Sequence, residues 1–405
     1  METITTPTAL QKEEAVLEDK ACEAVEKITM RLRIKHFTWA QFTMPLSTGG
    51  IGLLLASQPH RFAGLETIGK IFFIFDLVIL AVALATICAR FILHPGTFTQ
   101  SLVHPTEALF IPTVLITLAN LIGSAQVYGG PHCGHWFLVA MQVLFWLYVA
   151  AAFSGAVVQY LSLFTGHPNR LTVQSMTPAW ILPIFPIMIG GTLANLIAPE
   201  QNPTQRMAII VAGVSFQGLG WMVAFLMYAA YIQRLMAYGL PAPNLRPGMM
   251  ISVGPPSFTG LALIGLSQAL PPTQSFFATR PFAVQDLQAM ALFAGIFLWV
   301  LAFWFFCITT ISVMMGIREM SFHLIWWGLV FPNVGFTIAT IKIGQQLESE
   351  GILWVASIMS ILLVAMWIFV LGCHIRALVR KDIMMPGKDE DQACYKTPDE
   401  KRGII

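Results

Sequence analysis

Ten stretches dominated by apolar residues alternate with short polar segments along the 405-residue chain. Each is long enough to cross the hydrocarbon core of a bilayer as a helix, which takes about 20 residues. Both ends are polar, so the pattern predicts a ten-helix membrane domain over residues 36–381 between two tails, residues 1–35 and 382–405. The predicted helices cover residues 37–57, 67–92, 107–127, 135–165, 177–198, 205–238, 247–270, 286–317, 321–344 and 351–380.

Prolines divide these stretches into two classes, because the odd-numbered ones carry an interior proline and the even-numbered ones carry none. Proline lacks an N–H and clashes with the preceding turn, so each odd-numbered helix should break there. Broken backbone at membrane depth is tolerated only inside protein or beside a wet cavity. The breaks recur every 70 residues or so, which predicts five hairpins, each with one kinked and one straight helix, around a shared cavity. The prolines are Pro45, Pro112, Pro183 with Pro186, Pro255 with Pro256, and Pro332.

Small polar residues gather near these breaks. A helix that restarts after a break presents free N–H groups and a positive dipole end, which favour an anion. Nearby hydroxyls could bind the same anion, or they could satisfy backbone carbonyls that the break leaves open. The third repeat departs from the pattern, because the chain stays apolar after Pro186 until Thr192. The candidate pore residues are Thr43, Ser47, Thr48, Thr113, Thr117, Ser252, Ser257, Thr259 and Asn333.

Composition and charge support a membrane protein. Hydrophobic residues make up 56% of the chain and charged residues only 11%, against roughly 25% charged in soluble domains. The net charge of +2 gives no sign of nucleic-acid binding. Twelve Lys and Arg residues flank one face and five the other, so both termini should be cytoplasmic. Residues 13–37 could form an amphipathic helix on the membrane surface or a solvated tail.

The sequence carries no arrangement typical of an enzyme. It contains neither a metalloprotease nor a serine-hydrolase motif, and the predicted spans hold no array of acidic residues and histidines. The six cysteines show no paired spacing, and "HCGH" at residues 132–135 is interpreted as a polar turn rather than a metal site. We therefore expect no catalytic residues, no cofactor and no bound metal.

Four motifs resemble, in order along the chain, those of the tellurite-resistance/dicarboxylate transporter (TDT) family. They are "HFTWAQFTMPLSTGGIG", "HPTEALFIPT", "SVGPPSFTGLALIG" and "WWGLVFPNVGFTIATIKIG", and the resemblance covers roughly residues 30–380. The fungal malic acid, or C4-dicarboxylate, transporters are the branch that the chain resembles most. Plant guard-cell slow anion channels and the bacterial tellurite-resistance protein are more distant relatives.

This resemblance implies an all-α polytopic fold, with five helical hairpins around a pseudo-fivefold axis and the inner helices forming a pore. It also implies a homotrimer surrounded by lipid in the plasma membrane. The implied function is transport of malate, succinate or fumarate, as anions alone or together with protons. A chloride or nitrate channel, as in the plant branch, and a sulfite efflux pump, as among fungal relatives, are the alternatives.

The resemblance further implies that a phenylalanine of the ninth helix closes the pore. Phe331, in "VFPNVGF", stands at that motif, and Phe336 is close enough to be the alternative. Phe110, Phe185 and Phe258 lie near other breaks, so several rings could form a collar.

Charged residues near the predicted mouths could attract or release substrate. Lys342 directly follows the ninth-helix motif and should lie near the outer mouth, where it could bind carboxylates or extend to the interface. Arg61 and Arg280 share that face and are weaker candidates.

Four titratable groups are candidates for proton coupling or for structural roles. His36, His104 and Glu107 lie at the inner face, where the histidines could titrate near neutral pH or cap helices. Asp76 lies well inside a predicted span, where a carboxyl group is costly and often functional. It could couple transport to protons, or it could be structural, either neutral or paired with Lys70.

Overall fold

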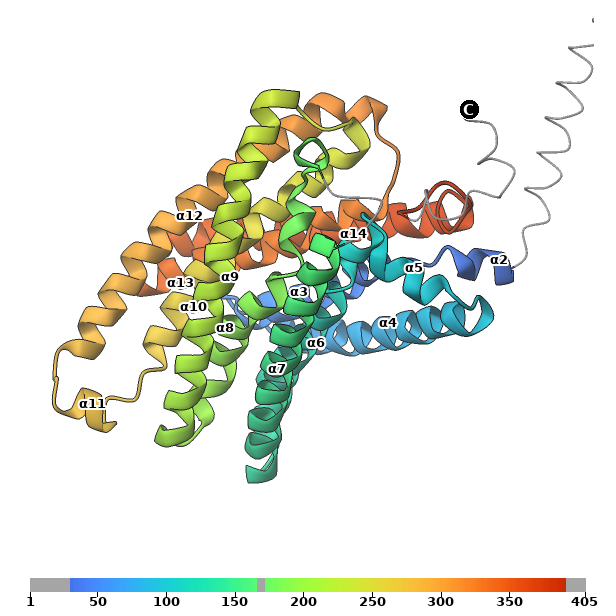
Figure 1. Cartoon of the computed structure of the whole chain (residues 1–405). Helices are drawn as coiled ribbons and strands as arrows, with labels where there is room; N and C mark the ends of the chain where they lie inside the picture. Colours follow the sequence, from blue (N-terminus) through green and yellow to red (C-terminus); the bar gives the residue numbers. More distant parts are fainter. Residues whose placement is uncertain (1–29, 166–171, 391–405) are drawn as a thin grey trace, which may run out of the picture.

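The computed structural model describes residues 30–165 and 172–390, and all regular secondary structure in these ranges is helical (Figure 1). The predicted surface helix of residues 13–37 therefore lies largely outside the described residues, as do most of the two predicted tails. Three short helices accompany the main ones: α2 (Met30–Lys35), α5 (Thr97–Val103) and α11 (Ser275–Ala278).

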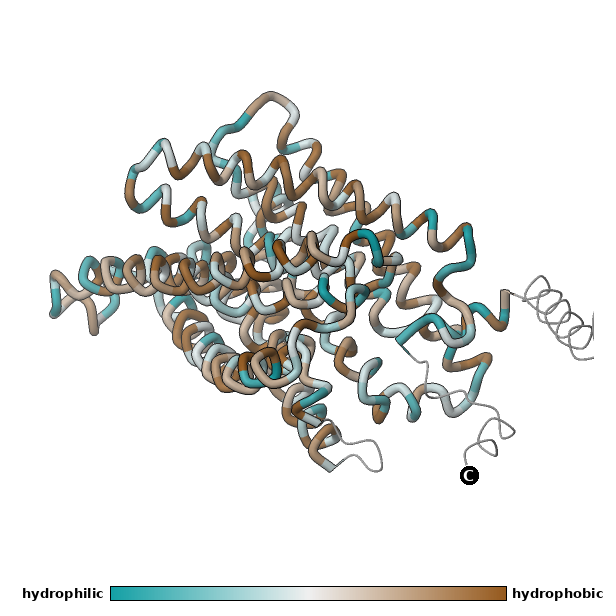
Figure 2. The backbone as a smooth tube through the Cα atoms, turned by 90° about the horizontal axis from the view of Figure 1, so that it is seen from above, coloured by the Kyte–Doolittle hydropathy of each residue, from teal (hydrophilic) through white to brown (hydrophobic). Residues whose placement is uncertain are grey.

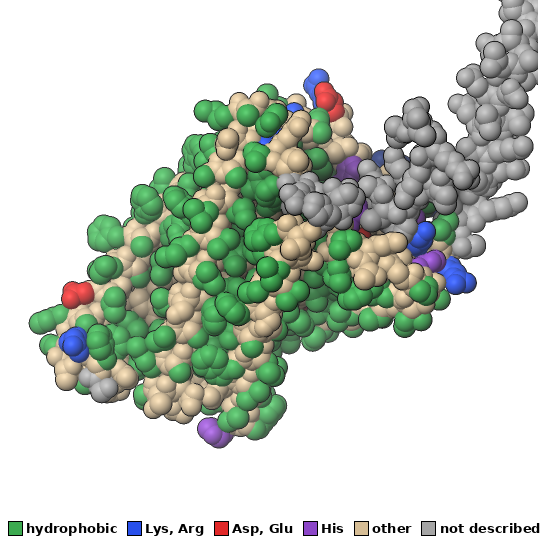
Figure 3. Space-filling model, in the orientation of Figure 1, with side chains coloured by type: hydrophobic (Ala, Val, Ile, Leu, Met, Phe, Trp, Pro, Cys, Tyr) green, Lys and Arg blue, Asp and Glu red, His purple; other side chains and the backbone are tan. Residues whose placement is uncertain are grey.

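Five long helices form the apolar exterior. Only 22 to 33% of the residues in their most apolar windows are buried inside the protein, so most of their side chains face outward. Figure 2 shows hydrophobic residues along their length, and Figure 3 shows a hydrophobic surface with charged side chains near the ends. Such a surface suits hydrocarbon rather than water. These helices are α4 (Leu65–Leu93), α7 (His135–Thr165), α9 (Pro203–Tyr238), α12 (Ala283–Gly316) and α14 (Glu350–Val379).

Five shorter helices alternate with the long ones and are buried. They are α3 (Thr43–Ala56), α6 (Thr113–Ser124), α8 (Phe185–Ile197), α10 (Gly254–Gln268) and α13 (Phe331–Gln346). Each follows a 3₁₀ segment, and a predicted proline stands at or beside its first turn. Proline is tolerated there because its missing N–H would have no partner within the helix. The prolines thus mark where each α-helix starts.

Eight helical segments among the described residues are long and apolar enough to span a membrane. They are the five long helices and three composites that include α6, α10 and α13. The predicted spans at residues 37–57 and 177–198 instead contain helices of 14 and 13 residues, α3 and α8. At 1.5 Å per residue each is about 20 Å long, shorter than the roughly 30 Å hydrocarbon core. Helix α6 is as short, but the 3₁₀ and π segments on either side extend it into a 26-residue span. The helical stretches around α3 and α8 are not both long and apolar enough to count as spans.

The short helices contact one another in a closed cycle. α3 contacts α6, α6 contacts α8, α8 contacts α10, α10 contacts α13, and α13 returns to α3. Each short helix also contacts the long helix that follows it, as α3 does with α4 and α8 with α9. The buried layer is therefore built from segments far apart in the sequence.

Both ends of the described chain meet at one face, here called the terminal face; the opposite one is the far face. Arg33 Nη2 donates to the carbonyl of Leu378 at 2.9 Å, and Thr38 Oγ1 donates to Glu390 Oε2 at 3.0 Å. The beginning of the predicted polar tail also packs against the protein, because Ile383, Met384 and Met385 are buried. The three apolar side chains in "DIMMPG" explain this packing. They lie within a stretch rich in charged residues, which is why the sequence predicted a polar tail there.

Candidate functional site

A cavity of about 970 Å³ lies among the five short helices, each of which contributes to its wall. Its residues run from the first turns of α8 and α13 to the segments that follow α3, α6, α8 and α10. The cavity therefore opens toward the far face. Its wall is mostly apolar, as expected for a membrane-embedded site that binds a small molecule through a few polar groups.

Lys342 supplies a positive charge to this wall. It projects from the last turns of α13, is half-buried, and has no hydrogen bond or ion pair with the residues that the structure describes. Arg61 lies nearer the solvent, on the segment after α3, and donates to the carbonyl of Ala56 at 3.0 Å. Glu200 is the one acidic residue among the lining residues, so the two cations leave the outer part of the cavity with a net positive charge that attracts anions.

Two asparagines bring carboxamides to the same wall. Asn120 of α6 donates through Nδ2 to the carbonyl of Leu46 at 3.0 Å, and Asn195 of α8 packs against the α-carbon of Gly265. Neither was predicted as a site residue, nor was Gln268 at the mouth. An asparagine inside an otherwise apolar span is the signal that could have identified the first two, because a buried amide needs partners.

Three phenylalanine rings form the inner end of the cavity. Phe185 packs edge-on against Phe258 and against Phe331, with ring centroids 5.6 and 6.3 Å apart. The rings fit because Gly254 and Gly335 have no side chains, since a Cβ on either would lie within 3.0 Å of a ring.

The other two candidate rings lie elsewhere. Phe336 stacks on Trp299 of α12 at 5.2 Å and faces away from the cavity, while Phe110 is buried in the core. Of the candidate rings, Phe331, Phe185 and Phe258 are thus brought together at the cavity.

The hydroxyl and amide residues near the breaks are buried, but they do not line the cavity. Ser257 Oγ donates to the carbonyl of Val253 at 2.6 Å, and Thr259 Oγ1 donates to the carbonyl of Pro255 at 2.7 Å. Ser47 donates to the carbonyl of Trp327, in a neighbouring segment. The others donate to carbonyls three or four residues earlier: Thr43, Thr48, Thr113, Thr117, Ser252 and Asn333. In this geometry they satisfy backbone groups, the second of the two roles considered for them.

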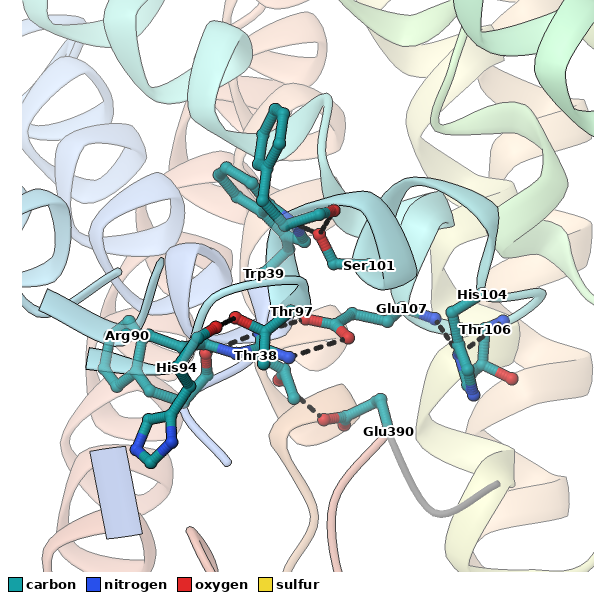
Figure 4. A network of polar contacts seen from close by, with 12 residues as sticks. Thr38, Trp39, Arg90, His94, Thr97, Ser101, His104, Thr106, Glu107 and Glu390 are labelled. Atoms are coloured by element: carbon teal, nitrogen blue, oxygen red, sulfur yellow. Dashed lines mark hydrogen bonds and ion pairs between the residues drawn. The ribbon is translucent and has the colours of Figure 1, made fainter. Parts of the chain in front are cut away.

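Glu107 belongs to a buried network at the terminal face (Figure 4). Its carboxylate forms an ion pair with Arg90, which also donates to the carbonyl of Phe37 at 2.9 Å. His104 Nδ1 accepts the backbone N–H of Glu107 at 3.0 Å. His36 is buried at the same face. None of these residues reaches the cavity.

Asp76 lies apart from that network, on α4, and is fully buried. It is not paired with Lys70, which forms an ion pair with Glu66 at 2.7 Å. Neither carboxyl oxygen of Asp76 has a hydrogen-bond partner among the described residues. No cluster of three or more His, Cys, Asp or Glu residues suited to a metal occurs within residues 30–165 and 172–390.

Sequence comparison with known proteins identifies the family. A model of the SLAC1 family, described as voltage-dependent anion channel, matches residues 36–375. The chain is 35% identical over 381 residues to a malic acid transport protein of Schizosaccharomyces pombe, covering 93% of this chain and 86% of that one. It is 25% identical over 368 residues to the sulfite efflux pump SSU1 of Trichophyton rubrum, covering 89% and 96% of the two chains. The chain therefore belongs to the SLAC1 family of anion channels and transporters.

Proposed function

We propose that this protein moves C4 dicarboxylates such as malate, succinate and fumarate across a membrane. The proposal is supported by the 35% identity to malic acid transport proteins over most of both chains. The sulfite efflux pumps are related at 25% or below. Sulfite, chloride and nitrate are therefore the competing substrates that an assay must include.

The observation that carries the proposal is the unpaired Lys342 in a largely apolar cavity. A cation with no protein partner among the described residues is available to a carboxylate, and low surrounding polarity strengthens the attraction. Arg61 nearer the mouth could receive the second carboxylate, while Asn120 and Asn195 could donate to substrate oxygens. A diacid has two separated charges, so this arrangement suits it better than a single halide ion.

The aromatic cluster of Phe185, Phe258 and Phe331 would close the pore below this site. A hydrated anion cannot pass a tightly packed hydrophobic constriction without losing its water. We assign the main gating role to Phe331, because its ring meets the cavity from the first turn of α13 and contacts Phe185.

The fold proposed around this pore has ten membrane helices in five hairpins. The cyclic contacts of the short helices support a pseudo-fivefold arrangement with the long helices outside. In this arrangement α3 and α8 complete their crossings with the 3₁₀ segments before them. We further propose a homotrimer in the plasma membrane with both termini in the cytoplasm, which the mass of the purified protein and accessibility labelling of its two ends would test.

Competition for flux tests the proposed substrate. In proteoliposomes, unlabelled malate, succinate and fumarate should suppress uptake of labelled malate, whereas chloride, nitrate and sulfite should suppress it weakly. Equal competition by sulfite or chloride would reject the dicarboxylate proposal in favour of one of the alternatives.

Lys342→Met should weaken malate affinity without loss of folding. A charge-assisted interaction contributes about 1.5–3 kcal/mol, so the apparent Kd should rise on the order of 10- to 150-fold. Lys70→Met is the matched control, because Lys70 lies on an exterior helix and pairs with Glu66. If both variants bind malate like the wild type, the carboxylates do not bind at Lys342.

A further inference from the structure

Asp76 occupies a pocket formed by the absence of a side chain in the neighbouring helix. A Cβ on Gly49 of α3 would overlap Asp76 Oδ2 and would lie 3.1 Å from the Cβ of Asn120. The carboxyl group thus lies against the backbone of α3, close to Asn120, which lines the cavity. Gly50, next to Gly49, lines the cavity as well. Asp76 is therefore separated from the cavity only by residues of its wall, Asn120 and the backbone of α3.

Among the described residues, no hydrogen-bond donor and no ion-pair partner reaches the carboxyl group of Asp76. Helices α3 and α6, which pack against α4, contain no titratable residue. Tyr128 stacks on Phe73 of α4, but its hydroxyl donates to the carbonyl of Gly52 at 2.6 Å. The charged residues of α2 lie at the other end of α4, where Arg31 donates to the carbonyl of Leu93. Helix α14 reaches α4 through Trp367, and its titratable groups, Glu350, Cys373, His374 and Arg376, lie near its two ends. On α4 itself Lys70 pairs with Glu66, and Arg90 pairs with Glu107. An isolated carboxylate in such a place is so costly that the group takes up a proton instead.

The third repeat contains a neutral counterpart of this arrangement. Gln217 follows Pro186 by 31 residues, as Asp76 follows Pro45, and its Oε1 would be overlapped by a Cβ on Gly191 of α8. Gln217 is buried and donates through Nε2 to Thr259 Oγ1 at 2.8 Å. The equivalent place in the fold therefore holds an uncharged amide, which matches a protonated carboxyl in shape and polarity.

We propose that Asp76 is a proton-binding residue of the transport cycle, protonated while it is packed against Gly49 and deprotonated when this pocket opens to the cavity. Movement of α3 against α4 would admit cavity water to the carboxyl group, and the proton would pass from Asp76 to that water. The reverse step returns a proton from the other side. This inference rests on the proposed function, because it couples that proton to anion movement.

Asp76→Asn tests the coupling, since asparagine imitates the protonated group and cannot release the proton. In proteoliposomes with the membrane potential clamped at zero, the variant should retain exchange of internal for external malate. It should lose the malate accumulation that a proton gradient drives in the wild type. Glu66→Gln, an exposed carboxyl on the same helix, should behave like the wild type. Gradient-driven accumulation by Asp76→Asn would overturn the proposal, and so would a wild type whose accumulation ignores the gradient.

A second measurement does not depend on the substrate. The infrared spectrum of the wild type at neutral pH should contain a carboxylic-acid C=O band that is missing in Asp76→Asn and present in Glu66→Gln. Absence of this band in the wild type would overturn the protonated state whether or not malate is the substrate. A wild type with the band but without malate flux would instead count against the proposed function. If Asp76→Asn does not fold, Asp76→Glu, which keeps the proton, should restore both folding and gradient-driven accumulation.

Discussion

Individual side chains of one type have different roles here, according to the helix face that carries them. Phe331 and Phe336 lie five residues apart on α13, yet Phe331 meets Phe185 at the cavity and Phe336 stacks on Trp299 of α12. Five positions correspond to about 500° of helical rotation, which places the two rings on different faces. Sequence proximity alone could not separate them.

Phe331→Ala should raise anion leak, because loss of the ring opens a hydrophobic constriction to water. Phe336→Ala is a suitable control, since it removes the same ring from a buried position of the same helix that packs against α12 and not the cavity. Leak currents across planar bilayers would measure the difference. If a folded Phe331→Ala protein conducts no more than the wild type, Phe185 or Phe258 is the next residue to replace.

The hydroxyls of Ser257 and Thr259 form hydrogen bonds within the protein. Each donates to a carbonyl four residues earlier, and Thr259 also accepts Gln217 Nε2 at 2.8 Å. Thr259→Val leaves that buried amide without its acceptor, which should destabilise the protein by about 1–3 kcal/mol. Ser257→Ala should destabilise it less.

Malate affinity should be unchanged in both variants, and the melting temperature should fall, more for Thr259→Val. Thr259→Ser keeps the acceptor and should melt close to the wild type. Weaker malate binding at unchanged melting temperature would instead place these hydroxyls on the substrate path.

At the scale of helices, the junction between a 3₁₀ segment and an α-helix is the repeated unit. The proline at each junction has no backbone N–H, but an N–H in the first turn of an α-helix has no acceptor within that helix. The break therefore leaves no additional unpaired group and is stable where it is buried in protein. At the terminal face these junctions are connected by side chains. Arg90, at the end of α4, links the carbonyl of Phe37 before α3 to Glu107 before α6.

Glu107→Gln should destabilise the protein strongly, because it leaves the Arg90 charge buried without its counter-ion. Removing one partner of a buried pair costs about 3–5 kcal/mol. Glu66→Gln breaks the exposed pair with Lys70 and should change the melting temperature little. Thermal unfolding in detergent would compare the two. Equal melting temperatures would mean that Arg90 does not depend on Glu107 for compensation.

At the scale of the whole molecule, apolar and charged surfaces are separated. The exterior helices are apolar over most of their length, and the charged side chains lie near the ends (Figure 3). The described chain begins and ends at the terminal face, while the cavity opens toward the far face. The apolar belt suits the hydrocarbon core of a bilayer, and the charged ends suit the aqueous interfaces on either side of it.

Much of this organisation was already determined by the sequence. The length and period of the apolar stretches predicted most of the helices, and α7 spans the predicted residues 135–165. Proline lacks an N–H and is tolerated only in the first turn of a helix, so the prolines located the five helix starts. Motif resemblance pointed to the family. These properties depend on neighbouring residues or on a regular repeat along the chain, so they can be predicted from the sequence without the tertiary structure.

Other properties were decided only by the tertiary structure. Whether Ser257 faces the cavity or its own backbone, and whether Lys70 pairs with Asp76 or Glu66, depends on helix rotation and on neighbours from distant segments. Asn120, Asn195 and the pocket at Gly49 arise where separate helices meet. The buried residues Ile383 to Met385 lie in a stretch whose charged neighbours suggested a solvated tail. Contacts between distant segments have no period in the sequence, so only the folded chain shows which polar groups share a cavity.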